Sequence, residues 1–242
     1  MSEKRVAVVT GGATGIGAAC VRELAAKGFR VGIHYRYSGD TAVRLLAEIG
    51  DGFLLPADLA AIDQVDALLE RLKGETDRLD VLVNNAGIAI DADMQRMRIE
   101  QFDAQRAVLR GAWYLTKRVL RQYMLRADSG RIINISSVVG HTGNAGQIPY
   151  AMEKAAMDAL TKSLAAELRG RNILVNSVSP GFIATEMTAR LPEEIRDGIL
   201  GRISLGRMGR PEEVAEVVGF LAAAGSYITG TVIHVNGGMY GG

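Results

Sequence analysis

Thr10-Gly11-Gly12-Ala13-Thr14-Gly15-Ile16-Gly17 directly follows the apolar run Arg5 to Thr10 and opens a stretch of helical period over 15–27. A glycine turn between a strand and a helix lets the backbone approach a pyrophosphate at the helix N-terminus, where free N–H groups and the dipole favour anions. A glycine cluster alone could be only a tight turn, but the flanking strand and helix favour a nucleotide site. The predicted contacts in this segment are Gly11, Thr14, Gly15, Ile16 and Gly17.

The alternation of strand and helix continues along the chain. Strands are predicted at Arg5 to Thr10, Arg30 to Tyr35, Gly52 to Pro56, Leu79 to Val83, Arg131 to Ser136, Ile173 to Val178 and Thr231 to Val235. Helical patterns lie near 15–27, 40–49, 61–76, 100–125, 150–169 and 211–223. Repeated βαβ units with right-handed crossovers place helices on both faces of a buried parallel sheet. We therefore expect a single Rossmann-type, doubly wound α/β domain over residues 1–242, with a seven-stranded parallel sheet.

Two segments interrupt this alternation. Residues 137–149 are rich in Gly, Ser and Asn, and residues 179–210 open with Pro180-Gly181. Loops of that length inside a compact domain are more often functional than idle, so both are expected to border a site.

The composition excludes several other classes of protein. The 242 residues are 48% hydrophobic, and 28 basic against 27 acidic residues give a net charge of +1, so no global field favours nucleic acid or an anionic membrane. The sequence offers no apolar run of membrane-spanning length and no signal peptide, which predicts a cytoplasmic protein. The lone Cys20 is expected to pack in a helix, and no metal site is expected.

The end of the second predicted strand distinguishes between nicotinamide cofactors, because a carboxylate there binds the ribose diol and repels a 2′-phosphate. The sequence reads His34-Tyr35-Arg36-Tyr37-Ser38, with no carboxylate. Arg36 can grip a phosphate through charge-assisted hydrogen bonds, with Ser38 as a supporting donor. These residues favour NADP(H), although Arg36 as a solvated loop cation in an enzyme that tolerates either cofactor remains the alternative.

The ends of the third and fourth strands supply further predicted cofactor contacts. Asp58, followed by Leu59, could accept a hydrogen bond from the adenine amino group or could cap the next helix. In Asn84-Asn85-Ala86-Gly87, the small residues would let the backbone of Asn85, Ala86 and Gly87 pass close to the adenine ribose. As an isolated segment it could equally be a turn.

Tyr150-Ala151-Met152-Glu153-Lys154 opens a predicted helix, and its i,i+4 spacing puts the phenol and the ammonium on one face. A lysine cation close to a phenol stabilises the phenolate and makes the phenol a stronger acid. Ser137 lies at the tip of the fifth strand, where its hydroxyl can bind a substrate carbonyl. Taken singly, Tyr150 could be a packed aromatic and Lys154 a solvated residue, but together with Ser137 they predict a catalytic set.

The segment after the sixth strand completes the predicted site. Pro180-Gly181-Phe182-Ile183-Ala184-Thr185 could meet the nicotinamide carboxamide through its backbone and the Thr185 hydroxyl, with a rigid loop start as the alternative. The predicted contacts here are Pro180, Gly181, Ile183 and Thr185, and Tyr150 and Lys154 are also expected to touch the cofactor.

These elements, in this order, resemble the short-chain dehydrogenase/reductase family over essentially the whole chain. Within that family the chain is most similar to bacterial 3-oxoacyl-[acyl-carrier-protein] reductases. The similarity is carried by Gly130 to Ile135, Ser137 to Gly140, Gly143 to Gln147, Tyr227 to Gly230 and His234 to Tyr240.

The resemblance implies NADPH-dependent reduction of a 3-oxoacyl thioester in fatty-acid or polyketide-like biosynthesis. In that reaction Tyr150 would donate the proton, Ser137 would position the oxygen, and Lys154 would tune Tyr150 and hold the nicotinamide ribose. It also implies a homotetramer packed through the C-terminal strand and the long helices. Basic residues beside the site would meet the acyl carrier protein; the nearest matches are Arg126, Arg169 and Arg171, with ordinary solvation as the alternative.

One departure from the family concerns the helix predicted over 100–125. The family usually has an Asn there that supports a proton relay behind the lysine, and this chain places Val108 or Leu109 at that position. The helix is one residue shorter than the family's, so we expect it to be straighter and turnover to be slower. Glu153, next to Lys154, is expected to point away and to matter little.

Two other functions stay open beside the resemblance. One is a reductase of acetoacetyl-CoA or another small carbonyl compound. The other is a weakly active cofactor-binding subunit of a mixed oligomer.

Overall fold

In the computed structural model, which describes residues 4–185, 188 and 193–241, seven parallel strands form one sheet in the order β3-β2-β1-β4-β5-β6-β7. The strands are β1 (Val6–Val9), β2 (Arg30–Tyr35), β3 (Gly52–Pro56), β4 (Val81–Asn84), β5 (Ser129–Ile135), β6 (Asn172–Pro180) and β7 (Val232–Val235). The strand order reverses between β1 and β4, so the connections that leave the carboxyl ends of these two strands run to opposite sides of the sheet. Ligands of such sheets bind in the crevice between these connections. The predicted Rossmann-type sheet is confirmed.

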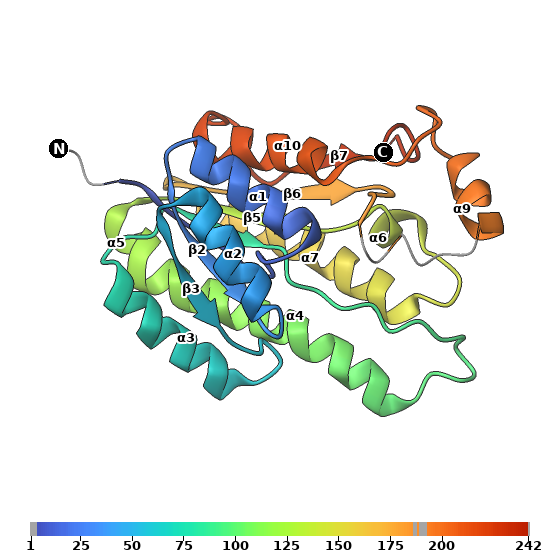
Figure 1. The fold of residues 1–242 in the computed structure, drawn as a ribbon, viewed down its shortest axis with the longest axis horizontal. Coiled ribbons are helices and arrows are strands. Elements are labelled where there is room, and N and C mark those ends of the chain that lie inside the picture. The colour runs from blue at the N-terminus through green and yellow to red at the C-terminus, as the bar shows by residue number, and fades with distance from the viewer. Residues whose placement is uncertain (1–3, 186–187, 189–192, 242) are drawn as a thin grey trace.

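Helices cover both faces of this sheet (Figure 1). The structure gives α1 (Gly15–Ala26), α2 (Gly39–Ile49), α3 (Ile62–Glu75), α4 (Ile99–Val119), the π-helical turn η1 (Leu120–Met124), α5 (Leu125–Ala127), α6 (Val139–Thr142), α7 (Ile148–Glu167), α9 (Glu193–Leu200) and α10 (Pro211–Ala223). The local sequence explains where several of these helices begin. Pro lies in the first turn of α7 and of α10, where a missing N–H costs nothing, and Glu213 reaches back to the backbone N–H of Arg210 at 2.7 Å.

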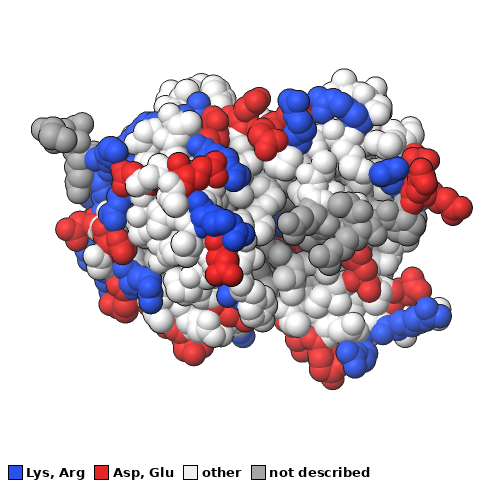
Figure 2. All heavy atoms as spheres, in the orientation of Figure 1, with Lys and Arg blue, Asp and Glu red and all other residues white. Residues whose placement is uncertain are grey.

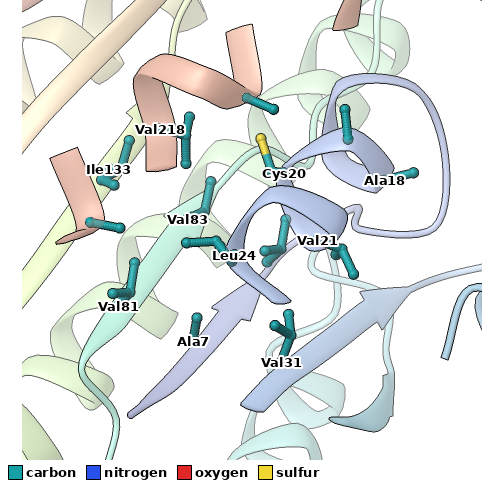
Figure 3. Packing of buried hydrophobic residues seen from close by; sticks show 14 of the residues in the cluster. Ala7, Ala18, Cys20, Val21, Leu24, Val31, Val81, Val83, Ile133 and Val218 are labelled. Atoms are coloured by element: carbon teal, nitrogen blue, oxygen red, sulfur yellow. The ribbon is translucent and has the colours of Figure 1, made fainter. Parts of the chain in front are cut away.

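Each face of the sheet has its own hydrophobic core. One core joins the strands to α1, α2 and α10, and Figure 3 shows Cys20, Val21 and Leu24 of α1 packed over the strands beside Val218 of α10. The other core joins them to α3, α4 and α7. Burial raises the pKa of the Cys20 thiol to about 12, so it stays protonated and acts as a small apolar group, as predicted.

The long helix α4 contains no Asn. It is a regular α-helix from Ile99 to Val119, and the π-helical turn η1 follows directly after Val119. Val108 is buried and Leu109 half-buried. Neither offers an amide, so the helix lacks the Asn at the point where the family has it.

The two long loops have short helices of their own. Segment 137–149 contains α6, and the described part of 179–210 contains α9. Residues 186–187 and 189–192 of the second predicted loop lie outside the described residues.

Basic and acidic side chains are interspersed over the face of the molecule seen in Figure 2, in line with the near-zero net charge. Within the described ranges, every helix is too short or too polar to cross a bilayer.

Candidate functional site

A cavity of about 650 Å³ opens at the carboxyl edge of the sheet and joins most of the predicted site residues. It is bordered by the glycine turn, by the segment after β4, by the tip of β5, by the start of α7 and by the segment after β6. The predicted residues that line it are Gly11, Thr14, Gly15, Ile16, Gly17, Asn85, Ala86, Gly87, Ser137, Tyr150, Lys154, Pro180, Gly181, Ile183 and Thr185. Sequence segments up to about 170 residues apart therefore meet at one site, as the parallel topology requires.

The glycine turn is shaped for close approach to a ligand. Gly11 and Gly15 have φ of +61° and +52°, a region that side-chain-bearing residues rarely adopt. A Cβ at Gly17 would lie 2.1 Å from the carbonyl oxygen of Gly11, so the first turn of α1 folds tightly against the loop. This backbone cradle leaves the N-terminus of α1 open to the cavity and fits a pyrophosphate.

Asn85 has a role that the sequence did not reveal. Its Nδ2 donates to the carbonyl oxygens of Thr10 and Gly11, at 2.9 and 3.1 Å. The Asn85 backbone N–H in turn donates to Thr10 Oγ1 at 2.9 Å. The side chain of Asn85 therefore holds the glycine turn to the end of β4, while its neighbours Ala86 and Gly87 leave the backbone accessible.

His34, near the end of β2, also supports the glycine turn and was missed as a functional candidate. The Gly11 N–H donates to His34 Nδ1 at 2.9 Å, and His34 Nε2 lies 3.1 Å from the carbonyl oxygen of Ala57. Both contacts are satisfied when Nε2 carries the proton, that is, when the ring is neutral. Burial lowers the pKa of His34 to about 4, although the Ala57 carbonyl and Asp58 oppose this effect.

The depressed pKa of His34 predicts an acid-sensitive fold. The unfolded chain, whose histidines have a pKa near 6.5, binds more protons than the folded chain between about pH 6.5 and pH 4. This contribution is therefore fully present above that window and is lost as the pH falls through it, up to about 3 kcal/mol. Urea unfolding of wild type and His34→Gln at about pH 7 and about pH 5 should show a smaller acid-induced loss in the variant. Equal losses in both proteins would contradict the assignment.

The residues predicted for the adenosine end of the cofactor lie beside the cavity rather than in its lining. Arg36 Nη2 pairs with Asp58 Oδ2 at 3.0 Å, so the predicted phosphate-binding cation and the predicted adenine acceptor contact each other. Asp58 Oδ1 accepts the Ala60 N–H at 2.9 Å, but the N-cap of α3 is Ala61. Asp58 thus closes the turn before α3 instead of capping it. Ser38 starts α2 without a side-chain capping bond, and the Leu59 side chain is buried in the core.

Ser137, Tyr150 and Lys154 face the cavity from two elements. Lys154 is buried, its Nζ donates to the Ile135 carbonyl at 2.9 Å, and it lies 5.5 Å from the centre of the Tyr150 ring. A Cβ at Gly87 would lie only 3.3 Å from Nζ, so the absence of a side chain there makes room for the ammonium. Ser137 Oγ accepts the Val139 N–H at 3.2 Å, which leaves its own hydrogen free for a ligand.

Glu153 points away from the cavity, as expected, and is buried. The side chain does not line the cavity, but it is 4% exposed and faces Gln105 of α4. Burial raises the pKa of Glu153, and this effect is opposed by the Lys154 charge and by the nearby Gln105 amide. The amide oxygen of Gln105 accepts the Ile90 N–H at 3.1 Å. These two buried polar residues link α7 to α4 and to the loop after β4, whose Gly87, Ile88 and Ala89 line the cavity.

Other cavity residues were not predicted as site residues. They come from α6 and the turn after it, from the chain after β6, and from the C-terminal segment, and they include Val139, Thr142, Gly143, Phe182, Arg202 and Met239. They line the cavity together with the predicted residues.

The three arginines predicted to lie beside the site do not lie there in this chain. Arg126 belongs to α5, and Arg169 and Arg171 precede β6, whereas the cavity is at the carboxyl end of that strand. The nine residues of β6 span about 30 Å, and Figure 1 shows α5 and α6 at opposite ends of the molecule. Arg171 pairs with Asp128 at 3.1 Å, and all three side chains are exposed.

Comparisons with known proteins agree with this geometry. A family model described as "Enoyl-(Acyl carrier protein) reductase" matches residues 11–240. The chain is 46% identical over 241 residues to the 3-oxoacyl-[acyl-carrier-protein] reductase FabG of Pseudomonas aeruginosa, covering 98% of this chain and 97% of that one. It is 43% identical over 240 residues to the FabG of Haemophilus influenzae, covering 98% of each chain.

A similar solved structure leads to the same group of proteins. It is a crystal structure bearing the provisional description of a betaketoacyl-ACP reductase, and it matches with a TM-score of 0.89 and 34% identity over 99% of both chains.

Proposed function

The chain belongs to the short-chain dehydrogenase/reductase family, and on that premise we propose that it reduces a 3-oxoacyl thioester carried by acyl carrier protein to the 3-hydroxyacyl thioester, using NADPH, in fatty-acid biosynthesis. The observation that carries the proposal is the single cavity that joins the glycine turn to Ser137, Tyr150 and Lys154. Relatives named for this reaction, at 42–46% identity over nearly the whole chain, support the substrate class.

The cavity residues fit a nicotinamide dinucleotide. The glycine turn offers backbone N–H groups where a pyrophosphate would lie, and Pro180, Gly181, Ile183 and Thr185 line the same cavity. Arg36 and Ser38, at the end of β2, would hold a 2′-phosphate. Arg36 would give up its ion pair with Asp58 to bind this phosphate. When bound, the reduced cofactor supplies the hydride that the carbonyl carbon accepts.

The chain's own groups handle the proton and the oxygen. The Ser137 hydroxyl donates to the substrate carbonyl oxygen and fixes its position. The Val139 N–H orients the Oγ atom, and the hydroxyl hydrogen is left for the substrate. The Tyr150 hydroxyl donates its proton to the same oxygen as negative charge develops there. The ammonium of Lys154, oriented by the Ile135 carbonyl, stabilises the resulting phenolate until solvent returns the proton.

The direct test uses the purified protein, NADPH and matched 3-oxoacyl thioesters on acyl carrier protein and on coenzyme A. We expect turnover with both and a higher kcat/KM with the carrier protein. A preference for the coenzyme A ester would favour the reductase of small carbonyl compounds. Cofactor binding without reduction of any substrate would favour the weakly active subunit, for which the missing amide at Val108 and Leu109 is the motivating observation.

Arg36→Ala is expected to weaken NADPH binding by about 10- to 100-fold, because a charge-assisted contact to phosphate is worth about 1.5–3 kcal/mol. Binding of NADH, which lacks the 2′-phosphate, should change little. Fluorescence titration of both cofactors measures the difference, and Arg44→Ala, an exposed arginine on the neighbouring helix α2, serves as the control. Equal losses for the two cofactors would remove the basis for NADP(H).

We also propose a homotetramer, which light scattering of the purified protein would test. Large apolar side chains are exposed on the long helices, among them Trp113 of α4, Met152 of α7 and Phe220 of α10, and the edge strand β7 is only half-buried. If Arg126, Arg169 and Arg171 meet the carrier protein, their distance from the cavity of their own chain requires them to serve the site of a neighbouring subunit.

A further inference from the structure

A largely buried Asp158 and three half-buried rings, outside the cavity lining, join α6, α7, β7 and the C-terminal segment. His141 Nε2 of α6 lies 2.9 Å from Asp158 Oδ2 of α7, with side chains 18% and 5% exposed. The His141 ring stacks on Tyr240 with centroids 5.2 Å apart, and it meets the edge of the His234 ring at 4.8 Å. His234 and Tyr240 also contact each other at 5.1 Å.

Asp158 depends on His141 for its charge balance. Within the described part of the chain neither carboxylate oxygen has a hydrogen bond of regular geometry, and His141 is the one cation paired with it. A buried carboxylate is costly without a partner group, so a shift that separated the two side chains would leave Asp158 buried and unpaired. The Asn236 side chain donates to the Tyr240 carbonyl at 2.9 Å and keeps the covering ring in place.

The cluster lies directly behind the catalytic residues. Asp158 is one helical turn beyond Lys154 on α7, and α6 begins two residues after Ser137. The two helices approach so closely that a Cβ at Gly140 would lie 2.8 Å from the Ala155 backbone nitrogen. The first residue of α6, Val139, supplies the N–H that fixes Ser137 Oγ. Any shift of α6 along α7 therefore moves Ser137 relative to Tyr150.

We infer that His141 and Asp158 form a positioning pair that locks the turn carrying Ser137 onto the helix carrying Tyr150 and Lys154. The pair also holds one wall of the cavity, formed by Val139 and Thr142, and through Tyr240 it reaches Met239 on the other wall. This matters because Ser137 and Tyr150 must reach the same substrate oxygen, and a misplacement of about 1 Å can cost up to about 100-fold in rate. The inference rests on the proposed reductase function.

Asp158→Asn tests the pair with a change of charge and almost none of shape. We expect kcat for the 3-oxoacyl thioester to fall about tenfold or more, while KM and binding of NADPH stay unchanged, because the glycine turn is untouched. The double variant His141→Asn/Asp158→Asn should lose no more than the single variant, since the two residues act as one unit. Glu48→Gln is the matched control, because it breaks the exposed ion pair between Arg22 of α1 and Glu48 of α2.

A spectroscopic signal shows independently whether the pair is ionic. The chain has three histidines, and the NMR signal of His34 is identified by its absence in His34→Gln. The pKa of His234 is lowered first by burial and then by the charge of His141, and it is raised by Asp158. Asp158→Asn should therefore lower the pKa of His234 further, and the double variant should raise it relative to that single variant.

The outcomes separate the alternatives. An unchanged kcat in Asp158→Asn, with the His234 titration moved, would overturn the positioning role. Parallel losses of kcat and NADPH binding would also overturn it, since they would indicate general loosening of the fold. An inactive wild type would defeat the proposed function and, with it, the inference.

Discussion

Tyr150→Phe is expected to lower kcat for the 3-oxoacyl thioester by about a thousandfold, because a positioned general acid contributes about 100- to 10,000-fold. Phe keeps the ring that lies beside Lys154 and removes only the proton donor. NADPH binding should be nearly unchanged, since the glycine turn and Lys154 remain in place. Single-turnover oxidation of NADPH, followed by absorbance, measures the chemical step.

Tyr227→Phe provides the control for that experiment, because Tyr227 is fully exposed and outside the cavity lining. It should retain the activity of the wild type. If Tyr150→Phe reduced the thioester at more than about a tenth of the wild-type rate, another group would have to supply the proton, and the role given to Tyr150 would be wrong.

Gly111→Ala is expected to lower the free energy of unfolding by about 2 kcal/mol and the Tm by roughly 5 °C. A Cβ at Gly111 would lie 1.8 Å from the Leu59 carbonyl oxygen, where α4 crosses the turn after β3. Alanine gains about 1 kcal/mol over glycine in helix propensity, but relieving a clash with backbone costs more. Thermal unfolding of the two proteins measures the net effect.

The same substitution at Gly74 separates propensity from packing. Gly74 lies in α3 with no atom within 4 Å of a built Cβ. Gly74→Ala should therefore stabilise the protein by about 0.5–1 kcal/mol. A destabilising Gly74→Ala, or a neutral Gly111→Ala, would show that the close approach of α4 to Leu59 does not control stability.

The sheet could be predicted from the sequence because its strands carry an unambiguous signal. The β1 segment Val6–Val9 is apolar at every position, which is typical of a strand buried on both faces, and two glycines follow after Thr10. The strand and helix bounds of the structure differ from the predicted ones by one or two residues in most elements. Short helices such as α6 escaped prediction, since four residues among Gly and Ser carry no periodicity.

The candidate site likewise contains some residues that the sequence predicts and others that it does not. Ser137, Tyr150, Lys154 and the glycine turn could be predicted because their spacing along single elements follows from helix and strand geometry. His34 and Asn85 hold the glycine turn through contacts between different strands, and no local pattern indicates such contacts. The pairing of Arg36 with Asp58 likewise depends on β2 and β3 being neighbours.

One expectation failed for a reason of three-dimensional arrangement. Arg126, Arg169 and Arg171 were expected beside the site, but a parallel strand carries its two ends to opposite edges of the sheet. Glu153 points away from the face of Lys154, as expected. That direction leads into the interface between α7 and α4, where the side chain is buried beside Gln105.

The most direct test of the reductase account follows the transferred hydrogen. The purified protein would be given NADPH deuterated at both positions of nicotinamide C4, together with a 3-oxoacyl thioester on acyl carrier protein, and the product analysed by mass spectrometry. The account predicts a 3-hydroxyacyl thioester with a single deuterium at C3, and none in the product of Tyr150→Phe over the same time. An unlabelled 3-hydroxyacyl product, or unreacted thioester with the wild-type protein, would contradict it.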